Sequence, residues 1–213
     1  ALRRAALGIL SSLESGVRVS IPALIDVALD AYAAQGIEFD RAAIRSQVVD
    51  FFITRTKVML KDAGNGADAI DAVLAAGIEE PMELVSRVEA LEKARKEDSE
   101  SFTNLAIAFA RANNLRDEAE GADYDDASLT EVQHALSTAV VEAEFKVAAA
   151  LAADDYAAAL ASLAALRAPI DEFFDKVMVK DEDLAVRAAN MKLLNRFANV
   201  FAHVADISKL ATK

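Results

Sequence analysis

The sequence predicts an all-α protein, a helical bundle of about nine or ten helices. Apolar residues recur at spacings of three and four along nearly the whole chain, which is the period of an amphipathic helix. Only 7 glycines and 3 prolines occur in 213 residues, so few positions interrupt a helix. No stretch alternates apolar and polar residues over a length typical of a strand. We therefore expect helices to be the only extended regular structure.

Helices in the first half of the chain are delimited by capping residues and glycines. The apolar stripe that starts at Leu2 is expected to stop at Ser15 and Gly16. Ser20, followed by a proline, predicts the start of a second helix that Gly36 ends. Further helices are expected over residues 40–61, around 70–74, from Pro81 through 91, and around 102–109 up to the Asn113-Asn114 pair.

The second half begins with the least helical stretch, residues 117–127, which we expect to be a solvated acidic loop. Ser128 and Glu131 have the spacing of a capping box and predict a long helix running to about residue 153. The next helix is expected to start at Asp154 or Asp155 and to end at 168, before Pro169. The final helix is expected over about 184–204.

Composition excludes several classes of protein. An apolar content of 54% argues against intrinsic disorder. The absence of cysteine excludes disulfides and thiolate metal sites, and it fits a reducing compartment such as the cytoplasm. The longest apolar run, 147–153, is far shorter than a membrane span. Because the chain opens without methionine in what reads as a helix entered midway, we expect it to be part of a longer protein.

Catalytic and metal-binding constellations are incomplete in the sequence. Glu131 and His134 have the spacing of half a di-iron bundle site, but no acid precedes His203 to supply the second half. The aspartates within 123–126 suggest calcium, yet Ser128 occupies the place where the calcium loop requires glycine. Phosphate-binding loops and nucleophile motifs are also missing. We expect no catalytic residues and no metal site in this chain.

The charges are distributed unevenly. The chain has 35 acidic and 23 basic residues, a net charge of −12, which argues against a general nucleic-acid coat. The acidic excess lies in residues 113–183, whereas the last 30 residues hold one acid and five bases. On the final helix Lys192, Arg196, Asn199 and His203 share one face, with Asn195 beside them. This face is either an ordinary solvated surface or a surface for phosphates and unpaired bases.

Four segments resemble one family of proteins. Taken together and in the same order along the chain, these segments closely resemble the C-terminal region of the bacterial glycyl-tRNA synthetase β subunit. The segments are 1–10 (ALRRAALGIL), 84–91 (LVSRVEAL), 109–115 (FARANNL) and a tail containing 173–179 (FFDKVMV), Arg187, Asn190, Leu193, Leu194, Phe201, 204–208 (VADIS) and Leu210.

This resemblance implies a domain organisation and a function. Residues 1–18 would be the end of a preceding HD-like region, and 19–213 a helical anticodon-binding domain of the DALR type. Such a domain recognises the anticodon arm of glycine tRNA. In the family the α subunit uses ATP and Mg²⁺ to charge the tRNA with glycine, within a cytoplasmic α2β2 holoenzyme. The chain alone would therefore bind tRNA without catalysing, and neither DNA nor a membrane is an expected partner.

Helix geometry and the resemblance together nominate candidate RNA-binding residues. Phosphate contacts are expected from Arg187, Lys192 and Arg196, and base contacts from Asn190, Asn195 and Asn199, with His203 beside them. Arg111 and Asn114 are weaker candidates. We also expect RNA to approach the final helix and to avoid the acidic loop. The alternative is a helical protein-protein interaction module without RNA contact, which would show a broad exposed apolar patch instead of a polar face.

Overall fold

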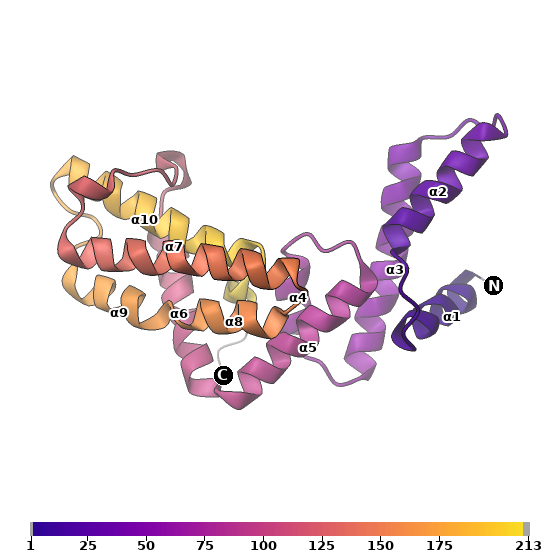
Figure 1. The fold of residues 1–213 in the computed structure, drawn as a ribbon, viewed down its shortest axis with the longest axis horizontal. Helices are drawn as coiled ribbons and strands as arrows, with labels where there is room; N and C mark the ends of the chain where they lie inside the picture. The colour runs from indigo at the N-terminus through magenta and orange to yellow at the C-terminus, as the bar shows by residue number, and fades with distance from the viewer. Residues whose placement is uncertain (1, 211–213) are drawn as a thin grey trace. The chain divides into compact units, whose positions relative to one another are not determined.

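A computed structural model of the chain describes residues 2–210, and the all-α prediction is confirmed (Figure 1). These residues form ten α-helices and three short 3₁₀ helices, with no strand among them. The chain divides into two compact units, residues 1–89 and 90–213. The predicted division after residue 18 concerns sequence relationship rather than compactness, and it stays a prediction.

The first unit contains α1 (Leu2–Glu14), α2 (Ile21–Ala34), α3 (Arg41–Asp62), α4 (Ala67–Leu74) and the beginning of α5 (Pro81–Glu97). Ser20 caps α2 by accepting a hydrogen bond from the backbone N–H of Ala23, as expected for a residue before a proline-initiated helix. Gly36 follows α2 with a φ of 75°, a conformation that a side chain disfavours. One core cluster of this unit consists of Ala6, Leu10, Leu13, Ile21, Ile25, Leu29, Val49 and Phe52.

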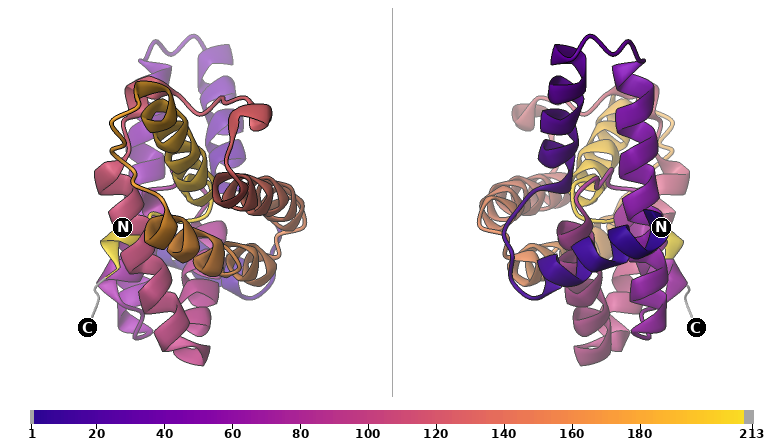
Figure 2. Two further views of the ribbon diagram at one scale, coloured as in Figure 1. Left: turned by 90° about the vertical axis from the view of Figure 1, so that its left-hand side faces the viewer. Right: turned by 90° about the vertical axis from the view of Figure 1, so that its right-hand side faces the viewer.

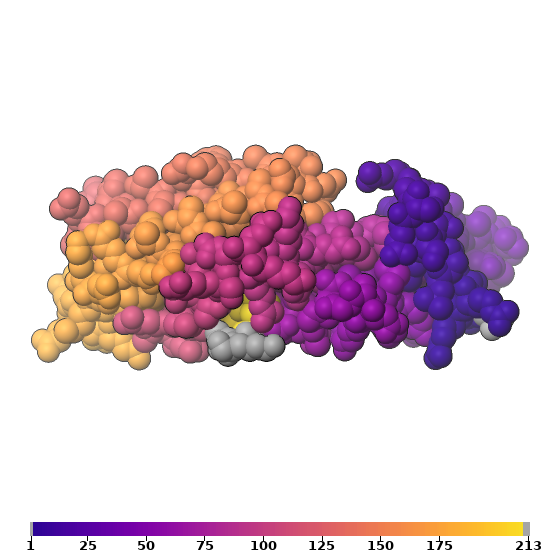
Figure 3. Space-filling view, turned by 90° about the horizontal axis from the view of Figure 1, so that it is seen from below, coloured from indigo at the N-terminus to yellow at the C-terminus, as the bar shows by residue number. Residues whose placement is uncertain are grey.

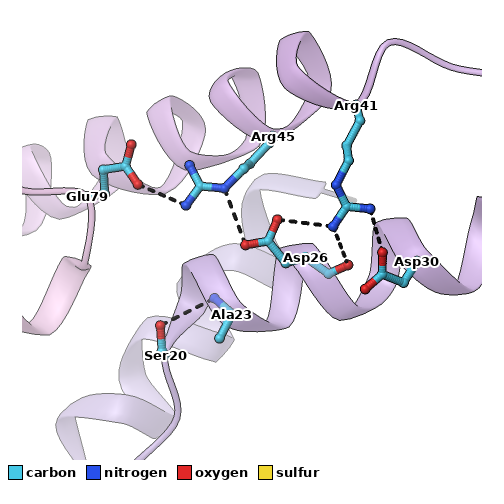
Figure 4. A network of polar contacts seen from close by, with 7 residues as sticks. All are labelled: Ser20, Ala23, Asp26, Asp30, Arg41, Arg45 and Glu79. Atoms are coloured by element: carbon cyan, nitrogen blue, oxygen red, sulfur yellow. Dashed lines mark hydrogen bonds and ion pairs between the residues drawn. The ribbon is translucent and has the colours of Figure 1, made fainter.

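Ion pairs join α2 to α3 on the side of this helical hairpin (Figure 4). The Arg41 guanidinium lies 2.6 Å from Asp30 Oδ1 and also contacts Asp26. Arg45 reaches Asp26 and, at 3.0 Å, Glu79. Hydrogen bonds to Glu79 and then Asp26 raise the pKa of Arg45. The hairpin is therefore held together by apolar packing on its inner face and by ion pairs along its side.

The second unit contains α6 (Ser99–Leu115), α7 (Glu131–Ala152), α8 (Tyr156–Ala164), α9 (Arg167–Lys176) and α10 (Leu184–Ala202), together with η1 (Glu118–Glu120), η2 (Asp126–Ser128) and η3 (Ile207–Lys209). Helix α7 packs against α8, α9 and α10, and α6 packs against α9, α10 and η3 (Figure 2). Helix α6 also contacts α8, and the space-filling view from below shows the α6 region against that of α8 and α9 (Figure 3).

Aromatic residues form the centre of this unit. The ring of Phe201 lies 4.9 Å from that of Phe109 and 5.1 Å from that of Phe197, measured between centroids. Tilted aromatic pairs at these separations are favourable beyond the area they bury. The cluster joins α6 to α10, so the position and rotation of α10 are fixed by packing on its inner side.

Two predicted helix boundaries were wrong. The capping box lies two residues later than expected: Thr130 is the N-cap of α7, and its reciprocal partner is Gln133. Ser128 instead closes η2 by donating to the carbonyl of Asp125. Likewise α8 ends at Ala164, before the expected 168, and Pro169 lies in the first turn of α9. A proline is tolerated there because the first N–H groups of a helix have no intrahelical acceptor.

Candidate RNA-binding surface

The predicted polar face of α10 is the accessible strip of a largely buried helix. Asp183 caps the helix by accepting hydrogen bonds from the N–H groups of Ala185 and Val186. From Asn190 onward most of the helix is buried. Lys192 and Arg196 are half-buried, and Asn199 and His203 are exposed at the end of the same strip.

Asn190 lies inside the protein. Its side chain is completely buried, and Oδ1 accepts a 2.7 Å hydrogen bond from Nε2 of Gln133. Its amide nitrogen lies within 3.3 Å of the carbonyls of Met178 and Val179. Gln133 also caps α7, so this one asparagine links α10, the start of α7 and the segment after α9. In the described structure the Asn190 amide is used within the fold.

Asn195 holds the acidic loop against α10. Its side chain is 3% exposed, and its amide nitrogen donates to the carbonyls of Asp117 at 2.7 Å and Gly121 at 2.6 Å. The Oδ1 atom is buried without a hydrogen-bonding partner among the described residues. Gly121 has a φ of 71°, which lets the loop turn back at this point. The loop is largely exposed, as expected, and two of its backbone carbonyls are in addition held by the Asn195 side chain.

Arg196 is engaged by an acidic partner on α7. Its Nε and Nη2 atoms form a two-point contact with the carboxylate of Glu144, at 2.8 and 2.7 Å. Its guanidinium also lies 5.6 Å from the ring centre of Tyr124, within the loop. The hydrogen bond to Glu144 is the main cause that raises the pKa of Arg196. The residue is thus permanently charged, and that charge is balanced locally.

Tyr124 completes the attachment of the loop. Its hydroxyl donates to Ser137 Oγ at 2.9 Å, and Ser137 donates in turn to Asp126 Oδ1. The 117–128 segment therefore rests on α7 and on the middle of α10. The segment is rich in acidic residues and its backbone lies against Asn195, so RNA would meet negative charge near the middle of the strip. The two ends of the strip are better placed for an anionic ligand.

The remaining basic candidates on α10 differ in their contacts. Arg187 is half-buried and donates from Nε to the carbonyl of Asp181 at 2.7 Å. Lys192 is half-buried and has no ion-pair or hydrogen-bonding partner among residues 2–210. Neither residue forms an ion pair within residues 2–210, and of the two cations Lys192 is the one that also has no hydrogen-bonding partner there.

A shallow groove lies between α7 and α10 at the C-terminal end of the strip. Its volume is about 350 Å³. Asn199 and His203 form its polar side together with Glu144, and the apolar lining comes from Val147, Ala148, Leu151 and Val200. The groove therefore combines a hydrogen-bonding wall with an apolar floor, which suits a small ligand with polar edges.

Arg111 and Asn114 line a separate hollow between α6 and η3, of about 630 Å³. The Arg111 guanidinium lies 4.1 Å above the ring of Phe174, a cation-π contact that holds its long side chain in place. Ile107, 53% exposed, lies on the same wall. These two candidates share a site with each other and not with the α10 strip.

No group of three or more histidine, aspartate or glutamate side chains in residues 2–210 is arranged to hold a metal ion. The ring of His134, considered above for a di-iron site, lies 3.3 Å from the hydroxyl of Thr138. Within the same described range, no helix has the length and apolarity required to cross a membrane.

Sequence reasoning missed two aromatic residues of this surface. Tyr124 was assigned to a solvated loop, and nothing local indicated that it would reach Arg196. Phe145 is 74% exposed on α7. The exposure of Phe145 could have been predicted from the sequence, because the residue falls between Glu144 and Lys146 and outside the apolar stripe of its helix.

Comparisons with known proteins agree on one family. Residues 1–75 match the family model described as glycyl-tRNA synthetase beta subunit. The chain is 37% identical, over 98% of its length, to the glycine-tRNA ligase beta subunit of Desulforudis audaxviator. It is also 37% identical to the same subunit of Aeromonas hydrophila and 34% identical to that of Syntrophus aciditrophicus.

The chain spans only about 30% of the length of these relatives. The match nevertheless covers 98% or more of the chain itself, and it includes both compact units. The four segments of the sequence resemblance lie within the same span. The chain belongs to the glycyl-tRNA synthetase beta subunit family.

Proposed function

We propose that this chain is the tRNA-recognition part of a glycine-tRNA ligase β subunit and that it contacts the anticodon arm of glycine tRNA. The observation that carries the proposal is the similarity, over nearly the whole chain, to beta subunits of glycine-tRNA ligases. The polar strip of α10 and the hollow at Arg111 supply surfaces of suitable chemistry.

Internal contacts of the candidate residues support a smaller set of RNA contacts within this proposal. Lys192 is available for a phosphate, and Asn199 is available for a base edge, with the exposed His203 beside it in the same groove. Arg111 and Asn114 form a second contact point on α6. The side chains of Asn190, Asn195 and Arg196, and the Nε of Arg187, are occupied within the protein and are assigned a positioning role instead.

The chain would serve catalysis without performing it. Charging of glycine tRNA would take place with the α subunit in an α2β2 holoenzyme of the cytoplasm, with ATP and Mg²⁺ bound there. The contribution of this chain would be orientation: each contact to the anticodon arm holds the far end of the tRNA, and this lowers the entropic cost of positioning its acceptor end.

A titration tests the proposal. The chain is mixed at low salt with labelled glycine tRNA, or with the same tRNA altered in its anticodon, and binding is followed by fluorescence anisotropy. We expect weaker binding of the altered tRNA. Lys192→Gln is expected to weaken binding and to reduce the slope of log K against log salt by about 1. Equal affinity for the two tRNAs would overturn the anticodon assignment.

Lys146→Gln is the matched control for this titration. Lys146 is an exposed lysine of α7 whose charge is already paired with Glu142 at 2.7 Å. It carries the same change of charge as Lys192→Gln. If both variants weaken binding equally, the effect comes from net charge and not from a contact at Lys192.

The alternative, a protein-interaction module, is favoured by one observation in the first unit. Leu24 and Val27 are adjacent on the outer face of α2 and are 49% and 66% exposed. Exposed apolar side chains that cluster on a helix mark a protein contact. Leu24→Ser with Val27→Ser would then reduce copurification with the α subunit. If the pair of substitutions reduces tRNA binding instead, the protein-contact assignment of this face is wrong.

A further inference from the structure

Phe145 is an aromatic side chain that the core does not use. The buried face of α7 is formed by Gln133, Leu136, Ser137, Val140, Ala143, Val147 and Ala150. Phe145 lies off this face and is 74% exposed, so its ring makes only a small contribution to the packing of the second unit. A single exposed apolar side chain is common on protein surfaces, so a role for Phe145 has to be inferred from what lies beside it.

The position of Phe145 relates it to the groove between α7 and α10. Ala148, three residues further along α7, lines the groove. Residues at this spacing are neighbours on a helix surface, with Cβ atoms roughly 5–6 Å apart. Phe145 does not line the groove itself, but this spacing places it beside Ala148, at the α7 edge of the groove.

The side of the groove that α10 forms has polar groups able to hydrogen-bond to the edge of a planar ligand. The Asn199 side chain has no hydrogen-bonding partner among residues 2–210, so its carbonyl oxygen can accept a hydrogen bond from a ligand and its amide NH2 group can donate one. His203 adds an exposed imidazole. The only carboxylate of the lining, Glu144, is compensated by Arg196 at 2.7 Å. The groove thus carries little net charge despite the acidity of the chain.

The surroundings of Phe145 suit a nucleobase better than a protein. A protein interface is centred on several large side chains that pack together. Along α7 the exposed neighbours toward its C-terminal end are Ala148, Ala149 and Ala152. The other large apolar side chains that are exposed in the second unit belong to different segments, namely Ile107, Met178 and Leu184. A lone ring beside a polar wall is the arrangement by which proteins stack and read unpaired bases.

We propose that Phe145 stacks on an unpaired base of the glycine tRNA anticodon loop, with the edge of that base facing Asn199 and His203. This inference rests on the proposed function and specifies a contact for it. Lys192 lies on the same strip, seven residues before Asn199, or about 10 Å along the helix axis. It is placed to hold a phosphate of a nearby nucleotide while the base occupies the groove.

The absence of tryptophan from the chain makes the contact directly observable. Phe145→Trp introduces a single indole fluorophore at the rim of the groove, and Leu184→Trp introduces one at a residue that is 73% exposed at the start of α10. On addition of glycine tRNA we expect the fluorescence of Phe145→Trp to be quenched by stacking. That of Leu184→Trp is expected to change little.

Affinity supplies a second readout. Phe145→Ala is expected to weaken binding of labelled glycine tRNA by roughly 5- to 150-fold, the range for loss of one base-aromatic stack. Leu184→Ala, which removes an equally exposed apolar side chain, is expected to leave the affinity unchanged. Circular dichroism of each variant verifies that the helical fold is retained.

The outcomes separate this inference from the function on which it rests. If the unaltered chain binds glycine tRNA and Phe145→Ala binds it equally well, the stacking site is wrong and the proposed function stands. If the unaltered chain does not bind glycine tRNA, both are overturned. If Phe145→Ala keeps tRNA affinity but loses copurification with the α subunit, the ring belongs to a protein contact and the inference is also overturned.

Discussion

Asn190 gives the sharpest test of the distinction between a residue that binds RNA and one that supports the fold. Asn190→Ala removes a hydrogen bond from Gln133 and the contacts to the carbonyls of Met178 and Val179. The buried side-chain amide NH2 group of Gln133 is left without this acceptor, at a cost of about 1–3 kcal/mol, and the lost contacts to the two carbonyls cost about 1 kcal/mol together. We expect the free energy of unfolding to fall by about 2–4 kcal/mol.

Urea unfolding followed by circular dichroism measures this loss. The two compact units need not unfold together. Amide hydrogen exchange in α7 and α10 therefore measures the loss of stability in the second unit alone, as the difference in opening free energy between the variant and the unaltered chain. Asn199→Ala is the matched control, because it makes the same substitution at an exposed position of the same helix. Its cost is expected to be below about 0.5 kcal/mol.

A double-mutant cycle with Gln133→Ala shows whether the destabilisation by Asn190→Ala arises from the hydrogen bond between Asn190 and Gln133. The two changes together are expected to cost less than their sum, by about 1–2 kcal/mol, because they remove the same hydrogen bond. The reasoning is refuted if Asn190→Ala is no more destabilising than Asn199→Ala. It is also refuted if Asn190→Ala leaves the fold intact while abolishing binding of glycine tRNA, since that would make Asn190 an RNA contact.

Three further predictions concern other parts of the chain. Arg196→Ala is expected to reduce stability by about 1 kcal/mol, because the two-point contact with Glu144 is only partly screened by solvent; an unchanged urea midpoint would argue against this pairing. Burial, the main cause, raises the pKa of Glu80, which accepts a hydrogen bond from the N–H of Ile21. The folded state thus keeps this proton to higher pH than the unfolded state, so this carboxyl makes stability fall as pH rises from its usual pKa to its raised one. Glu80→Gln should remove that fall, and a pH profile parallel to that of the unaltered chain would contradict the assignment. Thr130→Ala is expected to cost about 1 kcal/mol by removing the cap of α7, whereas Ser128→Ala is expected to cost less; the reverse order would restore the capping box predicted at Ser128.

The helices were predictable because their signals are local. Ser20 before a proline, Gly36 after the last apolar residue and Asp155 before Tyr156 each act within one turn of the helix they delimit. The error at Thr130 came from a competition between two overlapping motifs. The sequence offers both Ser128 with Glu131 and Thr130 with Gln133, and the buried link from Gln133 to Asn190, 57 residues away, accompanies the second.

The candidate surface was less predictable because it depends on contacts between distant segments. Helical spacing placed Lys192, Arg196, Asn199 and His203 on one accessible strip, as the structure has them. Spacing carries no information on what covers a face. Arg196 meets Glu144 across 52 positions, and Asn195 meets Asp117 across 78. The acidic loop was identified correctly from composition, but its docking on α10 is a tertiary contact that no local pattern encodes.

The net charge also has a structural consequence. Long-range attraction of RNA to a chain of net charge −12 is weak, so binding has to rely on short-range contacts. The loop concentrates acids beside the middle of α10, and this leaves Lys192 at one end of the strip and the groove at the other. RNA bound here would span the strip while avoiding its centre, which is a narrower expectation than approach to α10 as a whole.

Site-specific photo-crosslinking tests the central claim most directly. A photoreactive residue is placed at Asn199, or at Glu172 as a control that is exposed on α9 of the same unit, and the chain is irradiated with glycine tRNA. Mapping the joined nucleotides reports which part of the tRNA lies at each position. The proposed function predicts that position 199 joins nucleotides of the anticodon arm and that position 172 joins few or none. Equal crosslinking from both positions, or crosslinks from 199 to the acceptor stem, would contradict it.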